Sequence, residues 1–344
     1  MKLFLHKLTH WEYWPYQVVY IPVYFQYLYF AIKARSFFYF SASNPTFKNG
    51  GFFMESKKEI YDLIPQKYYP KTLLIYKGEN IDVIIRKLEL SEIKFPFIAK
   101  PDIGLRGTAV KKITNLEELK SYLEKCNFNI LLQQFIPFKN EIGLFYVRYP
   151  NQNKGVITGI VKKELLSVCG NGKSSIKSLI KKNIRAEFQL KNLEKELGSS
   201  INEVPQKGEN RVLVPYGNHC RGAKFIDDSS NISPKLVETI DNICKQIDGF
   251  YYGRLDIIFE SYEQLENEKN FQIVEINGAI SEPTHIYDPS HSLFFGFKTL
   301  CTHFKHLYKI SKLNHKNGIP YLTTKQGIKE WKKHHAHYTK ILKF

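Results

Sequence analysis

Cysteine is scarce in this chain, and the cysteines present are not arranged for disulfides or zinc. The five of them stand far apart, with no Cys-x-x-Cys pair. An odd, scattered set is typical of reduced thiols in a cytosolic protein, so we expect a cytoplasmic location. The five are Cys126, Cys169, Cys220, Cys244 and Cys301.

A long hydrophobic run is also lacking. Residues 18–32 are nearly all apolar, but Pro22 and Gln26 interrupt them. The run is shorter than the ~20 residues that cross a bilayer, which argues against a membrane span. Aromatic residues nevertheless occupy fourteen of the thirty positions from Trp11 to Phe40. Two interpretations stay open: an aromatic helix packed on the body of the protein, or peripheral docking at a membrane surface.

Acidic residues are few compared with basic ones. Lys and Arg number 50 against 33 Asp and Glu, a net charge of +17. This excess favours anionic partners such as nucleotides, phosphorylated substrates or an acidic membrane face. The last forty residues hold many Lys and a single acid, Glu330, which indicates either a solvated basic tail or a membrane or polyanion contact. Because no base-stacking or groove-reading motif is present, we expect no nucleic-acid partner.

The order of the expected elements indicates an α+β protein. We expect an N-terminal region (1–92), a first lobe (93–140), a second lobe (141–300) and a basic helical tail (301–344). In the first two parts we predict strands at Ser36–Ser43, Phe95–Lys100, Thr108–Ile113 and Ile130–Ile136 and a helix at Leu116–Lys125. In the second lobe we predict helices at Ser174–Lys182, Arg185–Leu197 and Lys235–Ile247, and strands at Leu144–Val147, Gly155–Lys162, Tyr251–Phe259 and Phe271–Ile276.

Two of these strands carry polar residues at alternate positions. Arg254 and Asp256 share one face of the first strand, and Glu275 and Asn277 share one face of the second. If the strands are neighbours, three oxygen ligands and a guanidinium converge. Such ligands suit Mg²⁺, which proteins bind through one or two carboxylates together with nucleotide phosphates.

A lysine ends an earlier strand and precedes a glycine loop. The ammonium of Lys100 can hold phosphate oxygens, while Gly104 and Gly107 let backbone N–H groups approach them. The segment Gly170–Ser174 is not a Walker A loop, because Ser167 stands where that motif requires glycine.

Together these motifs resemble the ATP-grasp ligases. Phe97–Pro101, Leu132–Ile136, Gly253–Asp256 and Glu275–Asn277 follow the order and spacing of that superfamily. The resemblance is to its D-alanine–D-alanine ligase end, while Val168–Ile180 and Asn218–Asp227 are similar to cyanophycin synthetases. It implies an ATP-grasp fold, in which two α+β lobes grip ATP, here with an atypical aromatic-rich N-terminal region.

The resemblance also implies roles for individual residues. Lys100 and either Lys162 or Lys163 would contact ATP phosphates, with the loop from Gly104 to Gly107 folded over them. Adenine and ribose contacts are implied at Gln133, Gln134, Phe135, Ile136 and Glu141. Asp256, Glu275 and Asn277 match the magnesium ligands, and Arg254 matches the arginine that stabilises the reaction intermediate. Substrate contacts are expected at His219, Arg221, Gly278, Ser281 and His285.

These expectations predict an ATP- and Mg²⁺-dependent ligase that joins a small carboxylate to an amine through an acyl-phosphate. The alternative is an ATP-binding module without turnover that acts in assembly or regulation at a membrane surface. Gln133 stands where an acidic residue is common in the family, and the usual glycine-rich opening is missing, so the sequence does not name the acid or the amine.

Overall fold

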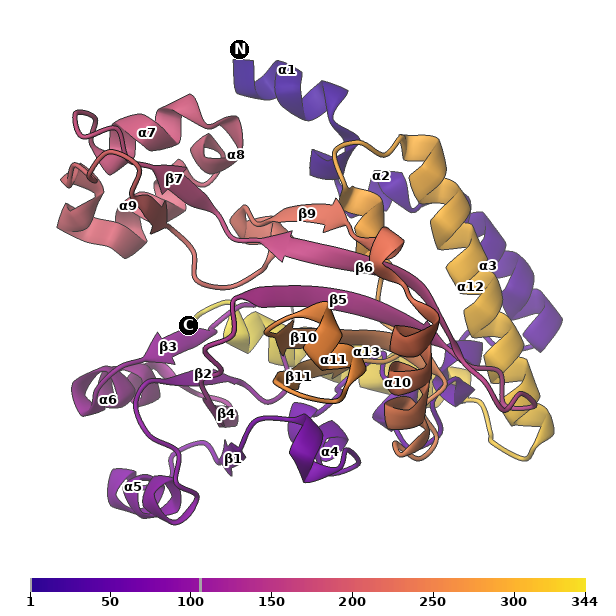
Figure 1. The fold of residues 1–344 in the computed structure, drawn as a ribbon. Coiled ribbons are helices and arrows are strands. Elements are labelled where there is room, and N and C mark those ends of the chain that lie inside the picture. Colours follow the sequence, from indigo (N-terminus) through magenta and orange to yellow (C-terminus); the bar gives the residue numbers. More distant parts are fainter. Residues whose placement is uncertain (1, 105–106) are drawn as a thin grey trace.

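The computed structural model describes residues 2–104 and 107–344, which form two antiparallel sheets surrounded by helices (Figure 1). The first sheet has the strand order β1-β4-β2-β3 and the second β11-β10-β5-β6-β9, with all neighbours antiparallel. A third, two-stranded sheet joins β7 and β8. The strands are β1 (Thr72–Ile75), β2 (Phe97–Pro101), β3 (Lys111–Ile113), β4 (Ile130–Gln134), β5 (Asn140–Val147), β6 (Val156–Glu164), β7 (Ser167–Cys169), β8 (Asn210–Val212), β9 (Lys224–Asp227), β10 (Tyr252–Phe259) and β11 (Phe271–Asn277).

Several helices begin at a residue whose side chain caps the first turn. The side chain of Asn115 accepts a hydrogen bond from the backbone N–H of Glu118 (2.9 Å), and Ser233 caps α10 in the same way. The described helices are α1 (Lys2–Thr9), α2 (Tyr16–Val19), α3 (Ile21–Ala34), α4 (Lys57–Tyr61), α5 (Ile81–Leu90), α6 (Leu116–Lys125), α7 (Ile176–Lys182), α8 (Ile184–Glu187), α9 (Leu190–Leu197), α10 (Pro234–Lys245), α11 (Tyr262–Glu266), α12 (Leu293–Lys316) and α13 (Thr324–Ile341). The α+β class expected from the sequence is confirmed.

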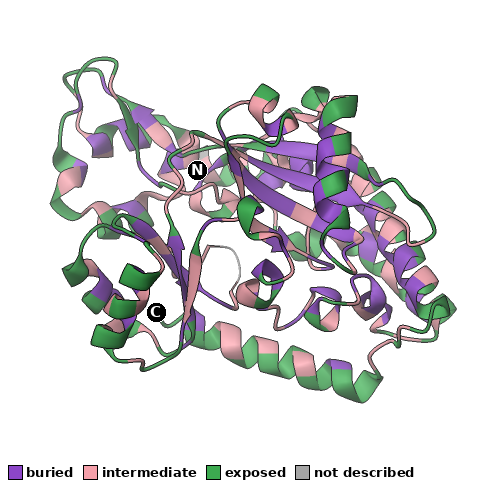
Figure 2. Cartoon of the chain, turned by 60° about the horizontal axis from the view of Figure 1, so that its bottom comes forward, coloured by how far each residue is buried: buried purple, intermediate pink, exposed green. Residues whose placement is uncertain are grey.

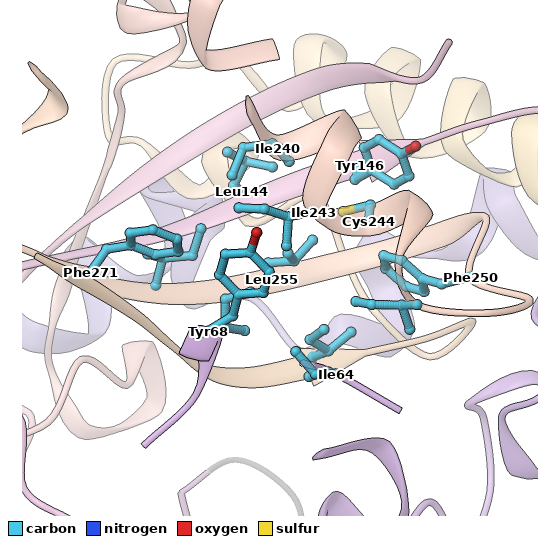
Figure 3. Packing of buried hydrophobic residues seen from close by; sticks show 14 of the residues in the cluster. Ile64, Tyr68, Leu144, Tyr146, Ile240, Ile243, Cys244, Phe250, Leu255 and Phe271 are labelled. Carbon is cyan, nitrogen blue, oxygen red and sulfur yellow. The ribbon is translucent and has the colours of Figure 1, made fainter. Parts of the chain in front are cut away.

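The second sheet is covered on both faces. On one face α10 packs Ile240 and Ile243 against Leu144 and Leu255 (Figure 3). On the other, α12 packs near Phe145 and Tyr252. Figure 2 shows these strands as largely buried, with the exposed residues mostly on the outward sides of the helices. Because side chains alternate along β10, Arg254 and Asp256 lie on the face opposite α10.

A small separate core lies between β6 and β9 in the sequence. Its hydrophobic cluster includes Val168, Ile180 and Leu193, from β7, α7 and α9. The predicted helix Arg185–Leu197 is wrong as a single element, since α8 ends at Glu187 and α9 starts at Leu190. At the break, the side chain of Gln189 donates to the carbonyl of Cys220 (3.1 Å), a tertiary contact that no local pattern encodes.

The N-terminal region differs from expectation at one predicted strand. Ser36–Ser43 is not a strand: its centre is a 3₁₀ turn at Tyr39–Ala42. Tyr39, Phe40 and Ala42 are all buried, so this segment is enclosed by core on several sides and lacks the alternation of a strand. Further along, β1 lies within residues 1–92, yet it pairs with β4 in the sheet of the first lobe.

The aromatic segment and the basic tail both pack on the protein. The α3 helix lies along α12 (Figure 1), where the rings of Phe30 and Tyr308 stack at 4.4 Å. The predicted tail (301–344) starts inside α12, which runs from Leu293 to Lys316, and ends with α13. In α13, Gly327 lies against Phe38 and Ile341 is buried in the first-lobe core. The solvated-tail interpretation is therefore wrong for the inner side of α13. Among residues 2–104 and 107–344, no helix combines the length and apolarity needed to cross a bilayer.

Candidate active site

The two polar strands are neighbours, as the sequence predicted. In the antiparallel pair β10–β11, Arg254 lies opposite Asn277 and Asp256 lies opposite Glu275. Directly opposite residues in such a pair project from the same face of the sheet. The structure thus brings the guanidinium, both carboxylates and the amide together.

Asp256 is buried between two cations. Its Oδ1 lies 3.2 Å from Nε of Arg254 and 3.1 Å from Nζ of Lys163. Burial opposes the charged carboxylate, but Arg254 and Lys163 outweigh burial and hold the pKa of Asp256 below its ordinary value. Gly143 of β5 makes room for this cluster, since a Cβ there would lie 3.1 Å from Oδ1 of Asp256.

The structure separates the two lysines that the sequence left as alternatives. Lys163 is buried, and its Nζ reaches Glu141 (2.7 Å) as well as Asp256. Lys162 points to the other face of β6 and is exposed. Gly217 packs against Lys163 and Glu141, where a side chain would collide with both. Lys163, and not Lys162, therefore stands at the site.

A β-bulge between β10 and β11 provides a contact between the two lobes. The partners shift from Asp256 and Glu275 to Ile257 and Ile273, which leaves Val274 without a partner in β10. The carbonyl of Val274 accepts hydrogen bonds from Tyr61 Oη and from Lys100 Nζ (3.0 Å).

Lys100 comes from β2 of the first lobe and is buried. Its Nζ also donates to Tyr61 Oη (2.9 Å) and to Gln133 Oε1 (2.8 Å). Burial lowers the pKa of Lys100 to about 8, although Glu275 opposes this shift.

Sequence reasoning missed two charged residues next to the carboxylate pair. Nζ of Lys57 lies 3.3 Å from Oε1 of Glu275 and 3.2 Å from the carbonyl of Gly104. Glu55 accepts the backbone N–H of Gly278 (3.2 Å), and burial raises the pKa of Glu55 to about 7. Glu55 precedes and Lys57 follows Ser56, the capping residue of α4, and only these flanking charges distinguished the two residues in the sequence. Their contacts cross some 200 positions of sequence, which local patterns do not report.

Comparison with known proteins adds to this geometry. Residues 62–185 match the model of the RimK-like ATP-grasp domain. The chain contains an ATP-grasp domain. The matched residues include Lys100, Gln133, Glu141 and Lys163, while the strands with Asp256 and Glu275 lie beyond them.

Individual relatives of the ATP-grasp domain are distant. The glutathione biosynthesis bifunctional protein of Clostridium perfringens is 28% identical over 137 residues, which is 35% of this chain and 18% of that protein. A bifunctional glutathione synthetase from Pasteurella multocida has a TM-score of 0.40 at 15% identity, covering 73% of this chain and 35% of that one. The D-alanine–D-alanine ligase of Bacillus anthracis has a TM-score of 0.43 at 12% identity, covering 76% and 68%. This chain spans less than a fifth of the length of the Clostridium perfringens protein.

The predicted hinge of the ATP-grasp domain is only partly strand. β4 ends at Gln134, so Phe135 and Ile136 lie outside the strand that was predicted to include them. Gln133 is buried with its side chain on Lys100 and Thr72, whereas Gln134 is exposed. The ring of Phe135 lies 4.0 Å from Nζ of Lys112. The adenine contacts at these positions stay predictions.

The glycine loop is described at both ends. Gly104 lies beside Lys57, and Gly107 has a positive φ of 67°. A Cβ at Gly107 would lie 2.8 Å from the side chain of Asn218, so the loop approaches the segment that holds His219. Leu105 and Arg106 lie outside the described residues.

The five predicted substrate residues fall into two groups. Gly278 follows Asn277 directly and contacts Glu55, and Ser281 donates to the carbonyl of Gly278. His219, Arg221 and His285 are held elsewhere. His219 lies 3.4 Å from Glu12, Arg221 pairs with Glu196, and His285 is buried against Gly159 and Phe295.

The chemistry of the paired strands fits magnesium bound together with a nucleotide. Among the described residues, no three His, Cys, Asp or Glu side chains gather closely enough to hold a metal by themselves. Two carboxylates and one amide are the protein ligands that Mg²⁺ takes when phosphates and water supply the others. Nδ2 of Asn277 is buried without a hydrogen-bond partner in the part of the chain that the structure describes, and this donor suits an oxygen of the nucleotide and not the metal.

Proposed function

We propose that the chain is an ATP-dependent carboxylate–amine ligase that works through an acyl-phosphate. The observation that carries the proposal is the register that sets Asp256 opposite Glu275 and Arg254 opposite Asn277. Lys163 and Lys100 extend the same cluster with two buried ammonium groups. Phosphoryl transfer requires cationic groups that bind the phosphates and carboxylates that bind a metal ion.

Each group has a distinct role in this proposal. Lys100 and Lys163 bind the phosphates of ATP as charged donors. Asp256, Glu275 and the amide oxygen of Asn277 would hold Mg²⁺, which when bound supplies neutralisation of the negative charge on the phosphates. Lys57 and Lys163 pair with Glu275 and Asp256 and offset the negative charge of these carboxylates.

The reaction has two steps. A substrate carboxylate oxygen bonds to the γ-phosphorus of ATP as the bond to ADP breaks. The substrate amine then bonds to the acyl carbon, phosphate leaves with the C–O bonding electrons, and the amine loses a proton. Arg254 faces this cluster and would stabilise the oxyanion that forms at the acyl carbon. A narrow hollow between the lobes is lined by Glu55, Lys57, Asn277 and Gly104. We propose that Glu55 contacts the substrate amine there and that Lys57 contacts the substrate carboxylate.

The test is ADP release from Mg·ATP with a panel of amino acids, short peptides and small carboxylates, assayed singly and in acid–amine pairs. We expect one pair to stimulate ADP release and to yield an amide product by mass spectrometry. Asp256→Asn should abolish the stimulation. A wild-type protein that binds ATP but releases ADP with no pair would instead support the module without turnover.

A further inference from the structure

The outer side of α3 presents an apolar stripe to solvent. The inner side packs against α12 through Phe30, Ala31 and Val23, which are buried. The outer residues are between 47% and 76% exposed and recur at the spacing of one helix face. Such contiguous apolar exposure marks an interaction surface. The stripe consists of Ile21, Phe25, Leu28, Tyr29 and Ile32.

The neighbouring helix presents a row of lysines. All five lysines of α12 are exposed and recur at helical spacing along its outer side. Neither α3 nor α12, both described in full, contains an Asp or Glu. This surface therefore carries a positive charge that no acid of either helix offsets. The row consists of Lys298, Lys305, Lys309, Lys312 and Lys316.

Each of the two helices carries a lysine ammonium group over an aromatic ring. Nζ of Lys33 lies 4.6 Å from the ring centroid of Tyr29. Nζ of Lys312 lies 5.8 Å from the ring of Tyr308, which is the ring stacked on Phe30. Aromatic rings and lysine ammonium groups thus lie side by side on both helices, with α3 and α12 adjacent in Figure 1.

We propose that this α3–α12 surface docks on the headgroup layer of an anionic lipid bilayer. The apolar stripe would enter the boundary between headgroups and acyl chains, while the lysines meet lipid phosphates. A second copy is a poorer occupant, because a two-fold interface on this surface would place lysines against lysines. Nucleic acid matches the lysines but not the aliphatic residues of the stripe.

Docking on this surface would also place the proposed active site at the membrane. Tyr20, which immediately precedes α3, donates a hydrogen bond to the side chain of Glu282. The carbonyl of Glu282 accepts from Arg254 (3.3 Å). Glu282 thus links the start of the docking helix to Arg254 of the site through two hydrogen bonds.

The experiment is sedimentation of the full chain with vesicles of phosphatidylcholine alone or mixed with phosphatidylglycerol, at low and high salt. We expect binding to the anionic vesicles only, weakened by salt. The double variant Phe25→Glu/Ile32→Glu should lose at least about tenfold in partitioning. Its matched control is Leu90→Glu, because Leu90 is 86% exposed on α5, away from this surface.

A second pair tests the charge. Lys309→Gln/Lys312→Gln should weaken binding, whereas Lys191→Gln/Lys195→Gln on α9 should not. Equal partitioning of wild type and Phe25→Glu/Ile32→Glu would overturn the proposal, as would equal losses in the α9 control. A wild-type dimer that Phe25→Glu/Ile32→Glu dissociates, without vesicle binding, would assign the surface to a second copy and also overturn it. None of these outcomes depends on ligase activity.

Discussion

Lys162 and Lys163 are adjacent in sequence, yet their side chains lie on opposite faces of β6. Lys163 joins Glu141 and Asp256 in the buried cluster, and Lys162 is exposed. Because these two adjacent lysines differ in the direction of their side chains, they form a matched pair for mutagenesis of the site. At the scale of single residues, the alternation of a strand decides which lysine can meet a phosphate.

Lys163→Met should weaken the binding of Mg·ATP by about 10- to 100-fold, the effect of losing one charge-assisted hydrogen bond. Lys162→Met should leave the affinity unchanged within about twofold, because an exposed lysine on the far face contributes only weak long-range attraction. Titration calorimetry measures both, after thermal melting has shown that the variants fold. Equal effects of the two substitutions would remove Lys163 from the nucleotide site.

Lys100 gives a pH dependence to nucleotide binding. Its pKa is lowered to about 8, chiefly by burial, so the ammonium loses its proton as the pH rises past about 8. We expect the ATP affinity of the wild type to fall between about pH 7 and pH 9, and Lys100→Arg to remove this fall because arginine stays charged.

The same shift predicts a stability effect of defined sign. The folded-state pKa of Lys100 lies below the unfolded value of about 10.4, so between about pH 8 and pH 10.4 the unfolded chain binds more protons. The contribution of Lys100 to the free energy of unfolding therefore rises with pH in this window. Urea titrations of wild type and Lys100→Arg should diverge there. Parallel pH profiles in both measurements would contradict the assigned shift.

At the scale of elements, prediction from sequence succeeded where capping and alternation act together. The helix Leu116–Lys125 has its predicted bounds, because Asn115 caps it and acids occupy its first turn. The strands β10 and β11 were predicted for their alternation, and their pairing followed. The predicted strand Ser36–Ser43 was wrong because its aromatic residues, which favour strands in general, are here buried by tertiary packing of a 3₁₀ turn at Tyr39–Ala42.

The parts of the site that were not predicted are contacts between distant elements. Lys57 reaches Glu275, and Lys100 reaches Val274 at a bulge. A bulge shifts the register by one residue and leaves no local sequence signal. Glu55 and Lys57 therefore became visible only when α4 was placed beside β11.

The α13 helix is the clearest element-scale difference from expectation. Its Ile341 is 1% exposed in the first-lobe core, while the adjacent Leu342 is 59% exposed. Ile341→Ala should lower the free energy of unfolding by about 2–4 kcal/mol through the cavity that it leaves. Leu342→Ala should change it by less than about 0.5 kcal/mol. Urea unfolding measures both, and equal small effects would mean that α13 is a dispensable tail.

At the scale of the whole molecule, the N-terminal segment joins parts that are far apart in sequence. Glu12 is buried and pairs with Arg185 of the small core through two contacts of 2.8 and 2.9 Å. Next to it, Trp11 donates to the carbonyl of His291 (2.9 Å), before α12. The segment therefore links the small α7–α9 core to the helices that cover the second sheet (Figure 1).

Glu12→Gln tests this link, because it removes the charge and leaves Arg185 partly buried without its partner. We expect the free energy of unfolding to fall by about 2–3 kcal/mol near neutral pH. Burial opposes the charge on Glu12, but His219 and Arg185 outweigh burial and lower the pKa of Glu12. The charge therefore stabilises the fold at pH values above the pKa of Glu12 in the unfolded chain, and this stabilisation is lost as the pH falls through its pKa in the folded protein. The difference between wild type and variant should therefore shrink below about pH 4.5. The control is Glu194→Gln, because the ion pair between Glu194 and Lys177 is at the surface, with both side chains about 40% exposed, and its loss should leave stability nearly unchanged. Urea unfolding at several pH values measures both variants, and an equal, pH-independent loss would show that the Glu12 charge does not hold the small core in place.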